Sequence, residues 1–459
     1  MEERLVKVLL KLREKSFFRA VQRTFAMLAP FVLIAAIFQG IYNSFLLPNS
    51  IFFNILGLDN VLSHAAFRSL RFVFSGVSWA IFGTFGVFAA YYMALYTARI
   101  YDKDSKLAGV SAIFVLFFIR EPRQNFDLTS LNLKMLSVKT MLWALIIGYI
   151  VGQIFHLLGA KYQGHKYEHV AGIKERALAS FKPIIASIGL AIVAGTVINF
   201  LQIKVVQSSY ITGVASSVIT SNNLLISIPL VTFSIFLHWL GIGTPIMAIF
   251  ESTNSGAATA NFNYALTHGS SWNVPYKYLG SSLVQSYGTL SGTAFVFSLI
   301  VVILLIDKNK YNKVVAKASI FPVMFNSING FWVAFPIYLN PLILIPLLLV
   351  PLVNMVVSSF AIFLHLVPVS VYPVLSGTPG VLIPYIGTNG SWQALLLTAL
   401  LLVMDVFIVM PFYKIHMNVE AKLEELDKQR DAGLLPLKKQ KKFVKSKEKN
   451  NEKITAEQR

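Results

Sequence analysis

Long apolar runs separated by short polar connections are the feature of this sequence that most restricts its fold. A helix needs about 20 apolar residues to cross a hydrocarbon layer of about 30 Å. Hydrophobic residues make up 55% of the 459 residues and charged residues only 13%, too little polar surface for water-soluble domains of this size. We therefore predict an all-α integral membrane protein with spans near 24–46, 71–95, 138–159, 183–201, 223–249, 281–306, 341–366 and 394–413.

Three further apolar segments are shorter or interrupted. Residues 107–119 are also predicted to span, whereas 318–337 and 368–390 are broken by Pro and Gly. Non-helical backbone at membrane depth is tolerated only where protein or a water-filled cavity satisfies its polar groups. The two broken segments therefore indicate a transport path, with an ordinary proline-kinked helix as the alternative reading.

The positive charge of the chain indicates orientation in a membrane rather than nucleic-acid binding. Its formal net charge is +19, and the basic residues gather at the two ends and in short loops between apolar runs. We predict that both termini are cytoplasmic, which requires an even number of crossings, about ten in all. The first residues show no small-residue cleavage site, so no cleaved signal peptide is expected.

The chain divides into four predicted parts. Residues 1–163 hold the N-terminal transmembrane helices, and 183–416 form a C-terminal transmembrane part. Between them, 164–182 mix charge with apolar residues at helical spacing, which predicts an amphipathic helix on the membrane surface or, alternatively, a solvated linker. Residues 417–459 form a basic cytoplasmic tail that opens with a short charged helix, and its lysines suit either anionic lipid or a topology signal alone.

Several kinds of chemistry find no support in the sequence. The chain has no cysteine, so it offers no disulfide, no thiolate ligand and no thiol nucleophile, and any phospho-cysteine would belong to a partner. We see no zinc-binding His/Glu pattern, no phosphate-binding Walker loop and no nucleophile elbow. We therefore expect no cofactor and no metal, and we assign no catalytic residue.

Polar residues inside the apolar second half are the candidates for function, because polar groups in a membrane are costly. They include Glu251 and Asn254, the stretch SYGTLSGT at 286–293, FNSINGFW at 325–332, SGTPG at 376–380 and TNGSW at 388–392. Hydroxyls and amides beside aromatic rings suit a sugar better than a lone cation, which needs a tighter shell of oxygen ligands. Close helix packing through Ser, Thr and Gly is the alternative explanation for each single residue.

Four segments, in order along nearly the whole chain, resemble one family. Residues 321–354 (FPVMFNSINGFWVAFPIYLNPLILIPLLLVPLVN) and 374–397 (VLSGTPGVLIPYIGTNGSWQALLL) resemble enzyme IIC, the sugar-specific membrane component of the bacterial phosphoenolpyruvate-dependent phosphotransferase system. Residues 17–38 are similar to its first helix and 96–117 to its first cytoplasmic connection. The resemblance is to the lactose, cellobiose and chitobiose branch.

The resemblance implies a fold, partners and a site. It implies a homodimer with two re-entrant hairpins, matching the broken segments, that takes up a disaccharide for phosphorylation by a separate IIB protein carrying phospho-cysteine, which works with IIA. The chain would then take part in sugar phosphotransfer only with those partners. The implied substrate-binding residues, together with the polar candidates above, are Asn329, Ser327, Glu251, Asn254, Thr289, Thr378 and Trp392.

The chain departs from the family at three positions. Ile328, Asn329 and Gly330 stand where the family reads Asn-Glu-Pro, so an amide that cannot accept a proton replaces a carboxylate. The Gly-Ile-His-Gly turn is replaced by residues 241–244 without its histidine, and Gln393 stands where an arginine is frequent. We expect His238 to be a packed core residue and Asp405 to pair with a polar group in the bundle.

Two functional hypotheses follow from this pattern. The chain is either a working phosphotransferase sugar permease, or a divergent IIC-like protein that binds or conducts a saccharide without phosphorylation or serves as a membrane scaffold or sensor. An ion-driven secondary transporter is disfavoured, because the spans lack the buried acidic relay that such proteins use.

Overall fold

The fold was examined in a computed structural model, which describes residues 15–120, 136–138, 141–161, 170–206, 222–243 and 255–431. Within these residues the regular structure is helical, and the only β-pairing is an isolated bridge between Ser50 and Ser376. Six described helical segments are long and apolar enough to cross a membrane. The chain is therefore an all-α, multi-pass membrane protein, as the apolar runs predict, while the total of about ten crossings stays a prediction.

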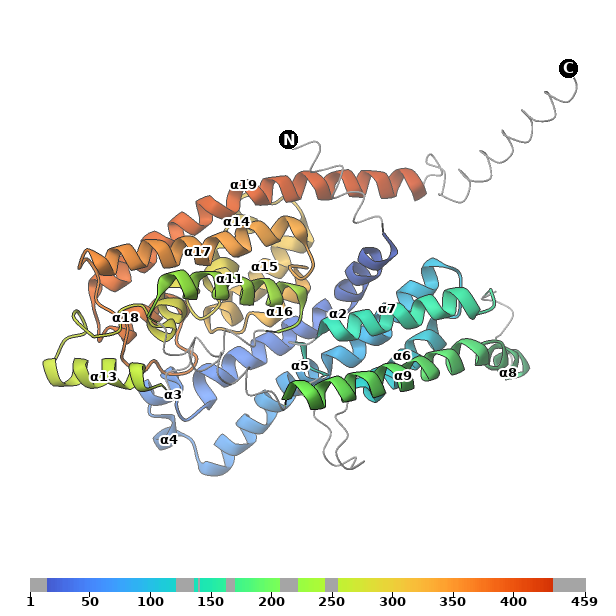
Figure 1. The fold of residues 1–459 in the computed structure, drawn as a ribbon, viewed down its shortest axis with the longest axis horizontal. Helices are drawn as coiled ribbons and strands as arrows, with labels where there is room; N and C mark the ends of the chain where they lie inside the picture. The colour runs from blue at the N-terminus through green and yellow to red at the C-terminus, as the bar shows by residue number, and fades with distance from the viewer. Residues whose placement is uncertain are drawn as a thin grey trace, which may run out of the picture.

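The N-terminal helices form one packed group. Helix α2 (Ser16–Ile41) runs into a short π-helix, η1 (Tyr42–Leu46), and two short helices, α3 (Ile51–Ile55) and α4 (Leu58–Val61), follow. The rest of the group is α5 (His64–Ile100), α6 (Ser105–Arg120), α7 (Met141–Leu158), α8 (Val170–Ala179) and α9 (Phe181–Val206). Helix α5 packs against α2, α6 and α7, and α6 packs against α9 (Figure 1).

The C-terminal group contains shorter and more interrupted elements. It consists of α11 (Leu224–Leu240), α13 (Gly256–His268), the π-helix η6 (Gly280–Gly288), α14 (Ala294–Ile306), α15 (Lys310–Met324), α16 (Asn329–Ala334), α17 (Pro341–Phe363), the 3₁₀ turn η7 (Gly380–Leu382), α18 (Ile383–Gly387) and α19 (Trp392–Asp431). Both segments predicted to be broken are interrupted, between α15 and α16 and again between α17 and α18. The two groups meet at α2, which packs against α5 from the first group and against α15 and α16 from the second.

Close approach of α16 to α2 requires glycine at position 330. A Cβ atom there would lie 2.5 Å from the Cβ of Ala36 and 2.7 Å from the carbonyl oxygen of Val32. Any side chain would therefore push the two helices apart. Gly330 thus fixes the short helix that follows the first broken segment against the long first helix.

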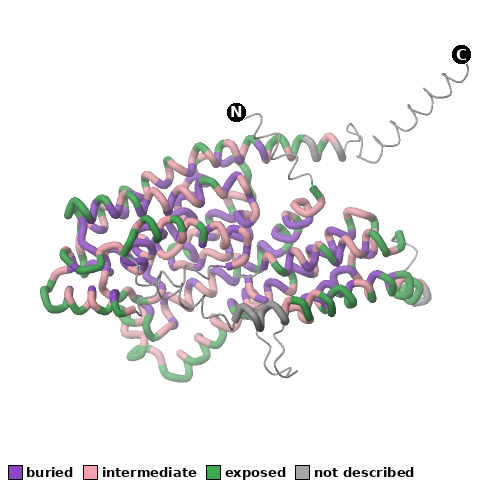
Figure 2. The backbone as a smooth tube through the Cα atoms, viewed as in Figure 1, coloured by how far each residue is buried: buried purple, intermediate pink, exposed green. Residues whose placement is uncertain are grey.

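The outer faces of the helices are apolar, as lipid contact requires. Figure 2 shows buried residues on the sides where helices face one another and exposed residues on the outer sides. Exposed side chains include Phe72, Leu225, Phe360 and Phe407. Such a surface would be unfavourable in water and is expected of helices that face hydrocarbon.

Two of the predicted helices, one between the two transmembrane parts and one after the last span, lie partly within the described residues. Of the expected amphipathic helix 164–182, residues 164–169 lie outside the described part and α8 covers 170–179. Its place on the membrane surface stays a prediction. The charged helix expected over 417–432 is a direct continuation of the last span, because α19 runs without a break for 40 residues. The tail beyond residue 431 is not described.

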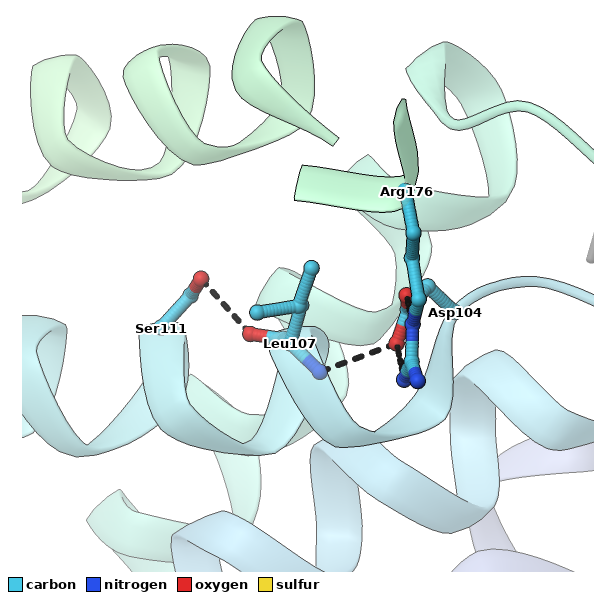
Figure 3. Close-up of polar contacts among 4 residues, drawn as sticks. All are labelled: Asp104, Leu107, Ser111 and Arg176. Carbon is cyan, nitrogen blue, oxygen red and sulfur yellow. Dashed lines mark hydrogen bonds and ion pairs between the residues drawn. The ribbon is translucent and has the colours of Figure 1, made fainter. Parts of the chain in front are cut away.

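An ion pair between the buried Asp104 and the half-buried Arg176 ties α8 to the first group of helices (Figure 3). Asp104 accepts a hydrogen bond from Arg176 Nη2 on α8 at 2.7 Å and another from Arg176 Nε. Asp104 Oδ1 also accepts from the backbone N–H of Leu107 at 3.0 Å, which caps the start of α6. One carboxylate therefore starts α6 and holds α8 beside it.

We predict that Asp104→Ala lowers the free energy of unfolding by about 2 kcal/mol, because it removes the cap of α6 and the hydrogen bonds from the half-buried Arg176. Thermal unfolding of the detergent-purified protein measures the effect. The matched control is Lys428→Ala, which breaks an exposed pair with Glu424 and should change stability by about 0.5 kcal/mol or less. Equal melting of the two variants would show that the Asp104 contacts do not stabilise the fold.

Candidate functional site

A cavity of about 630 Å³ lies where the broken helices of the C-terminal group meet η1 and α13. Its wall is rich in hydroxyl and amide side chains and includes the aromatic rings of Phe262, Phe325 and Tyr372. Among the lining residues that the structure describes, none is acidic, basic or histidine. The polar lining residues are Asn43, Thr259, Asn261, Ser281, Ser282, Gln285, Ser286, Ser291, Asn326, Ser370, Tyr372 and Ser376.

The first wall of the cavity is the π-helix η6. Its end is a sharp turn in which Leu290, Ser291 and Gly292 all have positive φ, at 48°, 54° and 87°. The freed backbone groups find partners within the turn: the N–H of Thr289 donates to the carbonyl of Val284, and that of Ser291 donates to the carbonyl of Gln285, both at 2.8 Å. A span that leaves the regular helix is thus satisfied by protein rather than by lipid.

The second wall is the non-helical chain after α17. Ser370 accepts a hydrogen bond from Ser286 Oγ at 2.8 Å, and the carbonyl of Pro368 accepts one from Tyr287 Oη at 3.1 Å, which ties this wall to η6. Further along, Gly377 has φ +67°, and a Cβ there would lie 2.5 Å from the carbonyl oxygen of Asn43. Glycine is required because this chain passes directly against η1.

The third wall is the turn between α15 and α16. Asn326 has φ +62° and its amide Nδ2 donates to the carbonyl of Thr378 at 3.1 Å. Beside it, Ser327 Oγ donates to Gln39 Oε1 on α2 at 2.8 Å. The two broken segments, far apart in the sequence, therefore meet through Asn326 and Thr378.

The residues expected from the sequence surround this region without lining the cavity. Asn329 is half-buried at the start of α16. Ser327 is buried against Gln39, and Thr378 is buried with its hydroxyl donating to the carbonyl of Leu375 at 2.7 Å. Thr289 is also buried, and its hydroxyl donates to the carbonyl of Val284 at 3.1 Å.

Of the remaining expected residues, the structure describes Trp392, which is not brought to the cavity. Trp392 is 65% exposed at the start of α19 and is absent from the lining, as an aromatic anchor at a membrane interface would be. Glu251 and Asn254 lie outside the described residues. His238 packs as expected, with ring centroids 4.4 Å from Trp332 and 5.6 Å from Tyr338.

Ser281, Ser282 and Gln285 of η6 were missed by sequence reasoning, although a signal was present, whereas Ser286 lies in the candidate stretch 286–293. Ser281, Ser282, Gln285 and Ser286 repeat at a spacing that places them on one side of a helix inside the expected span 281–306. A polar stripe within an otherwise apolar span indicates a cavity or a bundle interior. Asn43 and Asn261 carry no comparable pattern.

Fold and site together define a polytopic helical membrane protein with an uncharged polar cavity, the kind of site that binds small neutral molecules. No family model matches the chain. Two curated relatives are 28% identical: the cellobiose-specific EIIC component of the phosphotransferase system (PTS) from Lactococcus lactis subsp. lactis (strain IL1403) over 128 residues, and the PTS lactose-specific EIICB component from Staphylococcus epidermidis (strain ATCC 35984 and synonyms) over 129 residues.

Each alignment covers 28% of this chain, and it spans 26% of the first relative and 22% of the second, about a quarter of their length. A solved structure, the transporter ChbC, which is the IIC component from the N,N'-diacetylchitobiose-specific phosphotransferase system, is 18% identical, with a TM-score of 0.39. That match covers 93% of this chain and 99% of ChbC. The resemblance to IIC components that the motifs indicate is confirmed by the two curated relatives.

We predict that Asn326→Val destabilises the protein more than Asn326→Gly does, by about 2 kcal/mol. Both variants lose the hydrogen bond to Thr378, but only glycine adopts the positive φ of this turn without strain, and a β-branched residue is the least suited. Thermal unfolding in detergent compares the two. Similar melting temperatures for the two variants would mean that residue 326 does not adopt a positive φ in solution.

Proposed function

We propose that this chain is the IIC component of a phosphoenolpyruvate-dependent sugar permease and that the cavity between its broken helices holds a disaccharide. The observation that carries the proposal is the composition of the cavity wall, which combines neutral hydrogen-bonding groups with aromatic rings and no described charged residue. Sugar hydroxyls need many such donors and acceptors, and a volume of about 630 Å³ lies within the range of small-molecule sites. The relatives named for cellobiose and lactose support the same substrate class.

The broken helices supply the route by which the sugar crosses. The two interrupted segments meet at the cavity, where backbone carbonyls accept hydrogen bonds from the Asn326 amide, from the Thr378 hydroxyl and from other backbone N–H groups. Such backbone lets a polar solute sit at membrane depth without contact with lipid. We place both termini and the basic tail 417–459 on the cytoplasmic side, where the tail meets lipid head groups.

The chemical step belongs to partners. The chain has no cysteine, so a separate IIB protein carrying phospho-cysteine, supplied by IIA, would phosphorylate the sugar as it reaches the cytoplasmic side. In each protomer of the proposed homodimer, the part 183–416 supplies most of the sugar site, the N-terminal helices of 1–163 contribute Asn43 to its wall, and 164–182 connects the two parts. In this proposal Asn329, which lies three residues after Asn326 and outside the cavity lining, orients the hydroxyl that receives the phosphoryl group once the sugar moves from the cavity toward IIB.

We predict that Gln285→Leu weakens disaccharide binding at least about tenfold, because a sugar hydroxyl loses its partner in a desolvated site. Binding of radiolabelled cellobiose, N,N'-diacetylchitobiose and lactose to purified protein tests this. The control is Gln429→Leu in the charged end of α19, which should bind as the parent does. Failure of the parent to bind any of the three sugars would overturn the proposed function.

A second candidate function is sugar binding or conduction without phosphorylation. Asn329 favours it, because an amide keeps the orientation of a hydroxyl but cannot take its proton. General-base assistance contributes about 10²–10⁴ to the rate of a proton-transfer step. Its loss would slow phosphoryl transfer to the sugar while leaving sugar binding intact. Transfer activity therefore distinguishes the two candidates.

We predict that Asn329→Glu raises phosphoenolpyruvate-dependent formation of sugar phosphate by membranes supplied with the cognate soluble components, and that Asn329→Gln does not. Glutamate restores a proton acceptor, whereas glutamine changes only the length of the side chain. Strong turnover by the parent that Asn329→Glu leaves unchanged or lowers would return the chain to the ordinary permeases.

A further inference from the structure

A buried polar pair joins α17 and α19 beside the cavity wall. Asn354 and Asp405 are both fully buried, and Asn354 Nδ2 donates to Asp405 Oδ2 at 3.0 Å. The same nitrogen donates to the backbone carbonyl of Gly288 at 3.4 Å. An amide nitrogen carries two hydrogens, so each of the two acceptors receives one.

Asp405 fixes which way the Asn354 amide points. If the amide were turned over, its oxygen would face the carbonyl oxygen of Gly288, which can only accept, and that hydrogen bond would be lost. The second hydrogen bond, to the carboxyl group at position 405, holds the amide in the orientation that Gly288 requires, although Asp405 itself does not touch η6 in any described hydrogen bond.

Stability alone does not account for this pair. Asp405 Oδ1 and Asn354 Oδ1 are buried without a hydrogen-bond partner among the described residues. The helices packed on α19 offer these two oxygens no charged partner: α14 and α17 have no ionisable side chain, and α18 has only Tyr385. Tyr287 of the nearby η6 donates its hydroxyl hydrogen to the carbonyl of Pro368 instead. Leucine at both positions would remove the two unsatisfied oxygens. The double replacement should therefore lower the free energy of unfolding only slightly.

The acceptor of the second hydrogen bond connects the pair to the cavity. Gly288 is the last residue of η6, whose Ser281, Ser282 and Gln285 line the cavity. A Cβ at Gly288 would lie 2.6 Å from Met355 Cγ, so η6 ends in close contact with α17. The left-handed turn that follows leaves the carbonyl of Gly288 available to a side chain instead of a helical N–H.

We infer that Asn354 and Asp405 are positioning residues for the cavity: Asp405 orients the amide of Asn354, which holds the end of η6 and so sets the place of the cavity wall. The inference rests on the proposed function only in taking this cavity as the sugar site. The position of η6 itself can be measured without any sugar.

The absence of cysteine makes that measurement direct. Ser281→Cys places one thiol on the cavity side of η6, and Thr259→Cys places one on α13 across the cavity as the control. The rate of labelling by a water-soluble maleimide reports how accessible each thiol is. Adding Asn354→Leu or Asp405→Leu should raise labelling at position 281 about tenfold and leave position 259 within about twofold. Unchanged labelling at position 281 would overturn the inference.

An exchange of both residues for leucine separates positioning from simple helix contact. This exchange variant, Asn354→Leu with Asp405→Leu, restores an apolar contact between α17 and α19, but it leaves no donor at position 354 for the carbonyl of Gly288. The inference predicts that the melting temperature recovers while labelling at position 281 stays high. Recovery of both would show that the pair only joins the two helices and would overturn the inference.

Sugar binding by the same exchange variant, without the cysteines, completes the test. The inference predicts weaker disaccharide binding than in the parent, by about tenfold. If the parent binds no sugar but labelling follows the prediction, the proposed function fails and the positioning of η6 stands. If the parent binds sugar and the exchange variant binds it equally, the positioning role fails and the proposed function stands.

Discussion

The need to satisfy every backbone N–H and C=O away from water governs the whole of this structure. Regular helices meet it within one segment, so they face lipid along their outer sides. Where the chain leaves the helix, side chains and distant carbonyls must take over: the carbonyl of Gly387 accepts from both Val371 and Tyr372, and Thr293 Oγ1 donates to the carbonyl of Leu290 at 2.7 Å. Those places are enclosed by protein, and the cavity lies among them. The site thus follows from where the helices are broken.

Most of the helical layout was predictable from the sequence, because span length depends only on the thickness of the apolar layer. The runs 71–95 and 341–366 correspond to α5 and α17, and the proline and glycine interruptions correctly marked both broken segments. The run 281–306 misled, since its composition suits one span, yet it divides into η6 and α14 at a turn of three left-handed residues. That turn is held by contacts with α17, which local sequence does not contain.

The candidate site was predictable in kind but not in its residues. Motif resemblance led to Asn329 and Thr378, and the structure places Asn326 and the residues before Thr378 at the cavity instead. Which amide of the segment FNSING faces the cavity depends on the left-handed backbone of Asn326 and on the bond from Ser327 to Gln39 of α2. Both are tertiary effects. Asp405 found a polar partner in the bundle, as expected, but the identity of Asn354 and its second bond to Gly288 required the fold.

The last helix has a mechanical consequence. Helix α19 continues through Pro411 for 40 residues, a length of about 60 Å, and its charged end extends past the C-terminal group of helices (Figure 1). A span needs only about half of that length, so the remainder is a lever rigidly joined to the helix that carries Asp405. Tilting such a rod by about 10° moves its tip by about 10 Å. A small change in the tilt of α19 is therefore amplified into a larger displacement at its charged end.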